Sequence, residues 1–193
     1  MKTANNMNYY KYCKHLQQKY GIPTGSYFLS PSLKSKNLKI TRGRDGLYIH
    51  HICENEYIML CDPTSCHSQN ISFSVHEPQN LCYCDLLEHM ELHVKIVEEY
   101  AFNNPTAFVG IGGIINFLIP ELELMYTPEY QPTNYLAAVK NRIINKKTEY
   151  EQLKKYFWKI AKKTYSPLKY KEFRKIANAA TKKQLWYNLP PKS

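Results

Sequence analysis

The sequence predicts an α+β fold, in which a small strand-containing core carries helices on both flanks. Two short runs at 46–52 and 81–84 have strand character, and helical periodicity precedes and follows them. With 193 residues, 44% of them hydrophobic, the chain can form one domain with an extension or two small domains. We expect an N-terminal helix and loop (1–36), a central core (37–104), an apolar packing segment and linker (105–133) and a basic helical extension (134–193).

The N-terminal third is expected to lead into a hairpin. Residues 5–20 have helical character, and Gly21 and Pro23 end the helix; residues 25–36 form a polar loop. Residues 37–42 are predicted to pair with 46–51 across the Asp45-Gly46 turn. Five cations precede the first histidine pair, and they either form a solvated strand edge or contact phosphates: Lys34, Lys36, Lys39, Arg42 and Arg44.

Four histidines have the spacing of a metal site. His89 and His93 are four residues apart on an expected helix from Leu86 to about Phe102, so their imidazoles share one face. Asp85 and Glu88 have the spacing of a capping box at its start. His50 and His51 are neighbours on a strand and therefore point to opposite faces. The two helical imidazoles make up half of a metal site.

The order of these residues resembles the HNH endonuclease family, whose active site is a ββα-metal core. The matching blocks are His50-His51-Ile52-Cys53-Glu54 and the run from Asn80 through Leu81-Cys82-Tyr83-Cys84 to His89, followed by His93. They are similar to those of predicted bacterial and phage members. The chain departs from many members in its long loop 54–79, in lacking a proline and paired glycines after the histidine pair, and in lacking flanking Cys-x-x-Cys pairs.

The resemblance implies a role for each matching residue. His50, His89 and His93 would bind a divalent metal (Mg, Mn, Ni or Zn), and His51 would be the general base that takes a proton from the attacking water. Asn80 would tie the loop that holds the His51 ring. The implied function is hydrolysis of DNA to 5′-phosphate and 3′-hydroxyl ends. Alternatives are a DNA-binding protein of the same fold without cleavage, and an RNase or toxin-type nuclease. The remaining histidines are interpreted as ordinary side chains: His15, His67 and His76.

The segment after the histidine helix is the most apolar part of the chain. Residues 107–119 contain Gly110, Gly112 and Gly113 and are too short to span a membrane, which requires about twenty apolar residues. A buried helix or a tight packing site is expected there. Pro120, Pro128 and Pro132 then indicate a linker.

The C-terminal part is strongly basic. Residues 140–193 contain 16 Lys/Arg and 3 Asp/Glu, whereas residues 1–139 contain 10 and 13. One long helix is expected at 135–163, and Ser166-Pro167 should begin a second that ends near Trp186. The pair is either an amphipathic support or a DNA-binding appendage, and the charge favours DNA. The candidate DNA contacts are Arg42, Arg44, Lys154, Lys155, Lys162, Lys163, Arg174 and Lys175.

Six cysteines are present, and the N-terminus contains no apolar run typical of a signal peptide. We therefore expect a cytoplasmic protein with reduced thiols and no membrane partner. The alternative to buried thiols is a zinc site formed by Cys61, Cys66, Cys82 and Cys84, although the spacings are unusual. Nothing in the sequence indicates the oligomeric state.

Overall fold

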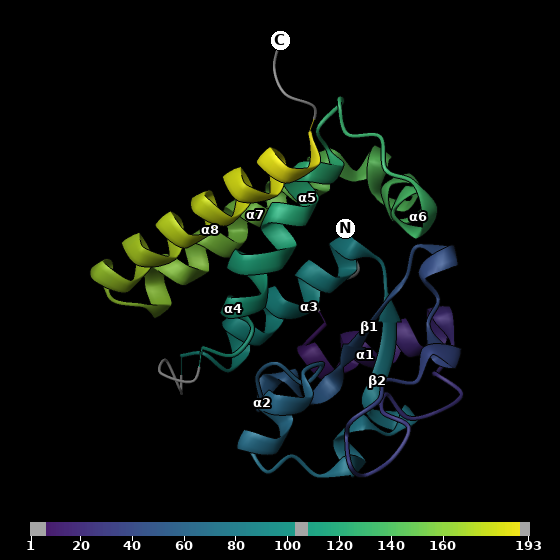
Figure 1. The fold of residues 1–193 in the computed structure, drawn as a ribbon. Coiled ribbons are helices and arrows are strands. Elements are labelled where there is room, and N and C mark those ends of the chain that lie inside the picture. Colours follow the sequence, from purple (N-terminus) through teal and green to yellow (C-terminus); the bar gives the residue numbers. More distant parts are fainter. Residues whose placement is uncertain (1–6, 103–107, 190–193) are drawn as a thin grey trace.

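A computed structural model describes residues 7–102 and 108–189. Figure 1 shows a mostly helical α+β chain with one small sheet. The elements in chain order are α1 (Tyr9–Tyr20), β1 (Tyr48–His51), α2 (Pro63–Ser68), β2 (Leu81–Cys84), α3 (Leu86–Glu99), α4 (Ile111–Gly113), α5 (Ile119–Met125), α6 (Asn134–Ile143), α7 (Lys147–Thr164) and α8 (Pro167–Asn188). The predicted fold class is confirmed at this level.

The sheet consists of β1 and β2 in antiparallel register, with His50 opposite Cys82 and His51 opposite Leu81. The strand expected at 81–84 is confirmed, but the hairpin between 37–42 and 46–51 is wrong. Residues Leu38–Ile40 and Gly43–Asp45 form 3₁₀ turns instead. Gly46 has φ 68° and ends the second turn, and a Cβ there would lie 2.5 Å from the carbonyl oxygen of Ala138 in α6. The glycine thus permits close packing of the turn against α6 rather than a hairpin.

The two helices beside the sheet follow their sequence patterns. Helix α1 begins after Asn8, whose side chain accepts a hydrogen bond from the Lys11 amide, and ends at Gly21; residues 5 and 6 of the expected helix lie outside the described part. Helix α3 has the predicted capping box between Asp85 and Glu88, and it ends at Glu99, a few residues before the predicted end. The capping box fixes the start of α3 directly after β2, which places both of its histidines beside the sheet.

Two predictions about the second half need correction. Pro120 does not start a linker. The apolar segment forms a π-helical turn (Ile114–Leu118) that leads directly into α5, and Pro120 lies in the first turn of α5. A proline at this position removes only an amide that has no partner in the helix. The long basic helix is two helices, α6 and α7, separated by a 3₁₀ turn (Ile144–Lys146). Ser166 caps α8 as predicted. Ala107, the first residue of the predicted apolar run, is outside the described residues.

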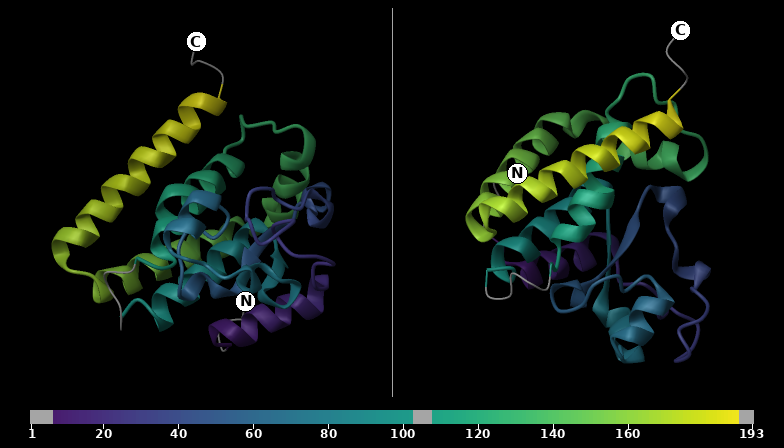
Figure 2. Two further views of the ribbon diagram at one scale, coloured as in Figure 1. Left: turned by 60° about the horizontal axis from the view of Figure 1, so that its bottom comes forward. Right: turned by 60° about the vertical axis from the view of Figure 1, so that its left-hand side comes forward.

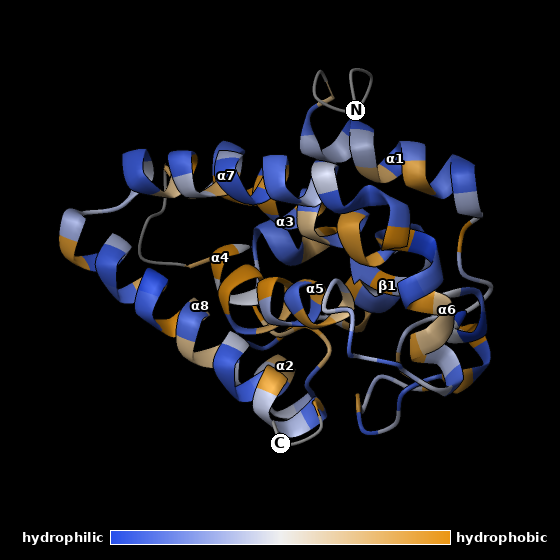
Figure 3. Cartoon of the chain, turned by 90° about the horizontal axis from the view of Figure 1, so that it is seen from above, coloured by the Kyte–Doolittle hydropathy of each residue, from blue (hydrophilic) through white to orange (hydrophobic). Residues whose placement is uncertain are grey.

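The basic helices share a hydrophobic cluster with α3. This cluster includes Met90 and Val97 of α3, Leu122 of α5, Phe157 of α7 and Phe173 of α8. Figure 3 shows α4 and α5 as apolar ribbons between α3, α7 and α8, whose outer faces are hydrophilic, and Figure 2 shows α8 on the side of these helices away from the sheet. Burial of aromatic side chains therefore holds α7 against α3 and α8 against α5. None of the helices in the described part of the chain is long and apolar enough to cross a membrane.

Candidate metal centre

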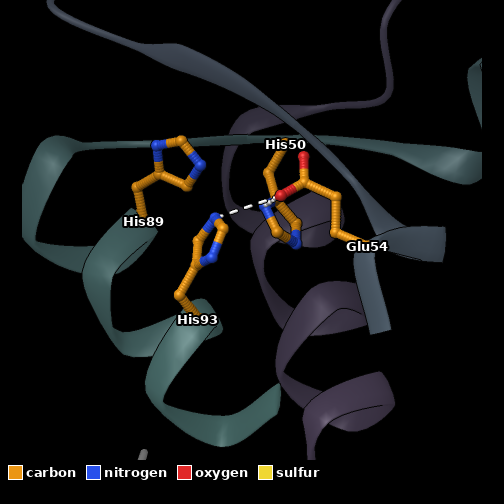
Figure 4. A group of neighbouring side chains, drawn as sticks. All are labelled: His50, Glu54, His89 and His93. Atoms are coloured by element: carbon orange, nitrogen blue, oxygen red, sulfur yellow. Dashed lines mark ion pairs between the residues drawn. The ribbon is translucent and has the colours of Figure 1, made fainter. Parts of the chain in front are cut away.

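Four side chains from three elements form the candidate metal centre. His50 comes from β1, Glu54 from the 3₁₀ turn that follows β1, and His89 and His93 from successive turns of α3. One donor atom from each residue lies within 4.8 Å of the donor atoms of the other three. Figure 4 shows the four side chains converging between α3 and the sheet. The three histidines predicted to be ligands, His50, His89 and His93, are thus close together, and Glu54 lies with them.

Hydrogen bonds orient the ring of His50, which is fully buried. The Tyr9 hydroxyl donates its only proton to the carbonyl oxygen of Ile52 at 2.9 Å. It must therefore accept from Nε2–H of His50, at 2.7 Å. That bond places the lone pair of His50 on Nδ1, and this buried atom has no hydrogen-bond partner in the described part of the chain. A buried lone pair that faces three other donors is the arrangement expected of a metal ligand.

The backbone at the start of α4 orients the ring of His93. Its Nδ1 lies 3.1 Å from the carbonyl oxygen of Gly110, which can only accept, so Nδ1 carries the proton. Gly110 has φ +73°, a conformation that favours glycine. A Cβ on Gly113 would lie 2.6 Å from Cε1 of His93, so the ring packs directly against the backbone of α4. The glycines interpreted as a tight packing site therefore support the ring of His93 and leave its Nε2 lone pair facing the centre.

Glu54 connects the two histidines of the strand to the helix. One carboxylate oxygen lies 3.1 Å from Nε2 of His93 and 3.8 Å from Nδ1 of His50, and the other lies 3.7 Å from Nδ1 of His51. Because a carboxylate and an imidazole lone pair repel at 3.1 Å, the contact with His93 requires a shared proton or a metal ion.

The electrostatics favour neutral His50 and His89 beside an ionised Glu54 carboxylate. Burial, reinforced by His93 and His89 and opposed by Glu54, lowers the pKa of His50 well below its usual value. Burial also lowers the pKa of His89 to about 3, with a further contribution from His93. Burial opposes ionisation of Glu54, but the neighbouring imidazoles of His50, His51 and His93 outweigh it and hold the pKa of this carboxyl well below its usual value. At neutral pH, His50 and His89 are therefore free to act as ligands.

The donor set fits a divalent transition metal. Nitrogen and oxygen ligands lie about 2.0–2.2 Å from Zn²⁺, so two ligands of one ion are at most about 4.4 Å apart. Donor atoms within 4.8 Å of one another reach this limit through shifts of a few tenths of an ångström. Imidazole-rich sets suit Zn and Ni, whereas Mg prefers oxygen ligands. Glu54 and His89 are only partly buried, so the cluster meets solvent at these two side chains.

His51 points away from this cluster, as the strand alternation requires. It is 1% exposed, and its Nε2 lies 3.1 Å from Nδ1 of His76, a fully buried residue. Burial, followed by the proximity of His51, lowers the pKa of His76 to about 4. Asn80 donates from its amide to the carbonyl oxygen of Ser74 at 2.7 Å, within the loop that carries His76. The interpretation of His76 as an ordinary side chain overlooked its contact with His51, whereas His15 and His67 are exposed.

The side chains predicted to contact DNA differ in their exposure and in whether they already pair with other residues of the chain. Arg42 is bound to Asp45 and to the Tyr20 carbonyl oxygen, each at 2.7 Å, and Lys154 pairs with Glu123 and Glu151. The Arg174 guanidinium stacks on Trp158 at 4.6 Å. The exposed members of the set are Arg44, Lys155, Lys162, Lys163, Arg174 and Lys175.

Two grooves are lined by three of these six exposed cations: Arg44 in one, and Lys155 and Arg174 in the other. One, of about 1030 Å³, runs along β1 past Tyr27, Lys36, Arg44 and Tyr135. The ring of Tyr27, which lines this groove, lies with its centroid 4.5 Å from that of the buried His51. The other, of about 610 Å³, lies between α5, α7 and α8 and contains Lys155, Arg174 and Lys182.

The cysteines do not form a second metal centre in the described part of the chain. All six are free thiols. Cys82 and Cys84 are buried on β2 beside α1, whereas Cys66 belongs to a separate apolar cluster with Phe28 and Leu60, and Cys61 is exposed. The only group of metal-binding side chains found among the described residues is the histidine and glutamate cluster.

Comparisons of the chain with models of protein families, with curated proteins and with solved structures found no match. The geometry of the site is therefore what bears on function. Sequence reasoning missed two of its residues. Glu54 was part of the quoted motif, three residues after His51, but it had no assigned role. His76 precedes Asn80 by four residues, and no short spacing links it to His51.

Proposed function

We propose that this protein is a metal-dependent endonuclease of the HNH type that hydrolyses DNA phosphodiester bonds. The observation that carries the proposal is the placement of Glu54: its carboxylate reaches the metal-binding cluster with one oxygen and His51 with the other. His50 and His51 point to opposite faces of β1. Glu54 nevertheless lies next to both the predicted ligands and the predicted base. Hydrolysis of a phosphodiester needs both a cation at the phosphate and a base at the attacking water.

The residues of the chain divide the work in this proposal. His50, His89 and His93, with Glu54, would hold a divalent metal. When bound, the metal supplies positive charge to the scissile phosphate and the leaving oxygen. His51 would accept the proton of the attacking water, and Asn80 would hold the loop behind it. Arg44 and Lys36, in the groove along β1, would contact phosphates near the scissile bond, and the cations of α7 and α8 would hold the rest of the nucleic acid.

The test is cleavage of supercoiled plasmid by protein stripped with EDTA and reloaded with Zn²⁺, Ni²⁺, Mn²⁺ or Mg²⁺. We expect nicking that EDTA abolishes, with ends that DNA ligase can rejoin because they carry 5′-phosphate and 3′-hydroxyl groups. The His51→Gln variant should lose activity by about 10²-fold or more, and His67→Gln, a change at an exposed histidine, should keep it. RNA and single-stranded DNA assayed in parallel test an RNase or toxin-type activity. Full activity of the His51→Gln variant would show that His51 is not the general base.

One observation favours a second function. Four protein ligands complete a tetrahedral site, and closed sites of this kind are structural, whereas catalytic sites keep a position for water. If all four side chains bind the ion, the metal would fasten β1 to α3 in a DNA-binding protein without cleavage. Bound metal and salt-dependent DNA binding without turnover on any substrate would support this alternative.

A further inference from the structure

His76 is held in place by both its backbone and its side chain. Its carbonyl oxygen accepts a hydrogen bond from the Tyr27 amide at 2.8 Å, and its ring packs edge-on against Phe28, with centroids 4.8 Å apart. The rings of His51 and His76 are perpendicular, with centroids 5.1 Å apart, and their nitrogens are 3.1 Å apart. The His51 ring therefore has a fixed polar partner on the side away from the metal-binding cluster.

His76 is fully buried, and its ring neighbours are Tyr27, Phe28 and His51, so a histidine at this position is costly. Nε2 of His76 is buried and has no hydrogen-bond partner within residues 7–102 and 108–189. Such an atom costs about 1–3 kcal/mol, and an apolar side chain of similar shape would avoid that cost. Among the residues that the structure describes, His51 is the only one that hydrogen-bonds to the His76 ring, so this contact distinguishes the histidine from a phenylalanine at the same position.

We propose that His76 is a positioning residue for His51: it accepts the Nε2–H of His51 and so leaves a lone pair on Nδ1, on the side of Glu54. A metal ion bound through the other carboxylate oxygen would offset the charge of Glu54, so this lone pair would not face an uncompensated anion. The assignment rests on the proposed nuclease function. Because burial keeps His76 neutral, its ring retains a lone pair that can accept this bond. The opposite arrangement, with His76 as donor, puts the proton of His51 on Nδ1. His51 then has no free lone pair with which to accept a proton from a substrate water.

The proton balance of the reaction follows from this arrangement. His51 accepts one water proton on Nδ1 as the hydroxide oxygen bonds to phosphorus, and the ester bond to the leaving oxygen breaks. The resulting imidazolium keeps its Nε2–H bond to His76, while its new Nδ1–H faces the Glu54 oxygen, now 3.7 Å away. The proton then passes to solvent, and the leaving 3′ oxygen takes up a proton to become the 3′-hydroxyl group. His76 acts through His51 and touches no reacting atom.

The experiment reads the proton position on His51 directly. Long-range ¹H–¹⁵N correlation spectra of the Zn²⁺-loaded full chain distinguish the two neutral tautomers, and His51→Gln assigns the signal. We expect His51 to carry its proton on Nε2. His76→Phe fills the same space without a hydrogen bond, and should mix the tautomers and lower kcat about 10- to 100-fold with unchanged KM and zinc content. His76→Asn, whose amide oxygen can accept the bond, should restore both, and His67→Asn is the control.

An Nδ1–H tautomer of His51 in the wild-type protein would overturn the proposal, and so would a His76→Phe protein with unchanged tautomer and kcat. The wild-type spectrum decides the direction of the hydrogen bond even if His76→Phe does not fold. If the wild-type protein cleaves no nucleic acid, the nuclease proposal fails separately, and the tautomer comparison alone then supports or overturns the assignment of His76.

Discussion

Gly113→Ala tests whether the packing of α4 fixes a metal ligand. The added Cβ would lie 2.6 Å from Cε1 and 2.8 Å from Nδ1 of His93, whereas ordinary contacts begin near 3.4 Å. The ring must therefore move by about 0.8 Å, which is the difference between 2.6 and 3.4 Å. Because the ring is the far end of a side chain, it can rotate away and the fold should survive. The rotation breaks the hydrogen bond to Gly110 and takes Nε2 out of reach of the ion.

The expected magnitudes separate stability from metal binding. In the metal-free protein, Gly→Ala in a helix stabilises by about 0.4–1 kcal/mol, and loss of the hydrogen bond to Gly110 costs about 1 kcal/mol. The free energy of unfolding should thus change by less than about 1 kcal/mol. Displacing one ligand should weaken zinc binding by about 10- to 100-fold, which corresponds to about 1.4–2.8 kcal/mol. Zinc should consequently raise the melting temperature of this variant less than that of the wild type.

The assay is calorimetric titration of EDTA-stripped protein with Zn²⁺, together with thermal unfolding in the presence and absence of the ion. Gly112→Ala is the matched control, because a Cβ at this neighbouring helical glycine has no atom within 4 Å. The control should bind zinc as the wild type does. Wild-type affinity in Gly113→Ala, or an equal loss in Gly112→Ala, would refute the reasoning.

Three further predictions concern charge and protonation. Glu54→Gln should weaken zinc binding by at least about tenfold in the same titration, because the ion loses its anionic ligand; unchanged affinity would exclude Glu54 from the centre. Unfolded His76 binds a proton near pH 6.5, whereas folded His76 does so only near its pKa of about 4. The free energy of unfolding should therefore fall by about 1.4 kcal/mol per pH unit as the pH decreases from 6.5 to 4. Urea unfolding of His76→Phe should lack this component, and an identical pH slope would contradict it. Lys155→Glu should weaken DNA binding and reduce the dependence of log K on log[salt] by about one unit, whereas Lys11→Glu on α1 should have little effect; equal effects would argue against a DNA surface on α7 and α8.

Much of the metal centre could be predicted because it depends on short-range geometry. The four-residue spacing of His89 and His93 fixes one helical face, and the capping box at Asp85 fixes where that helix begins. Strand alternation correctly separates His50 from His51. These relations follow from helix and strand periodicity and need no knowledge of the rest of the fold.

The remaining features depend on contacts between distant parts of the chain. The pairing of β1 with β2, rather than with residues 37–42, joins segments about thirty residues apart. Gly46 packs against α6, which follows it by about ninety residues in the sequence. Glu54 reaches the cluster because a 3₁₀ turn reverses the chain directly after β1. His76 meets His51 only because its loop folds under Tyr27 and Phe28. No periodicity within one element carries such information.

The most direct test of the metal centre is anomalous diffraction at the zinc edge from crystals of the full chain grown with Zn²⁺. We predict one peak per chain, about 2.0–2.2 Å from Nδ1 of His50, Nε2 of His93, a nitrogen of His89 and a carboxylate oxygen of Glu54. A map without a peak among these four side chains, or with zinc bound only at cysteines, would contradict the account.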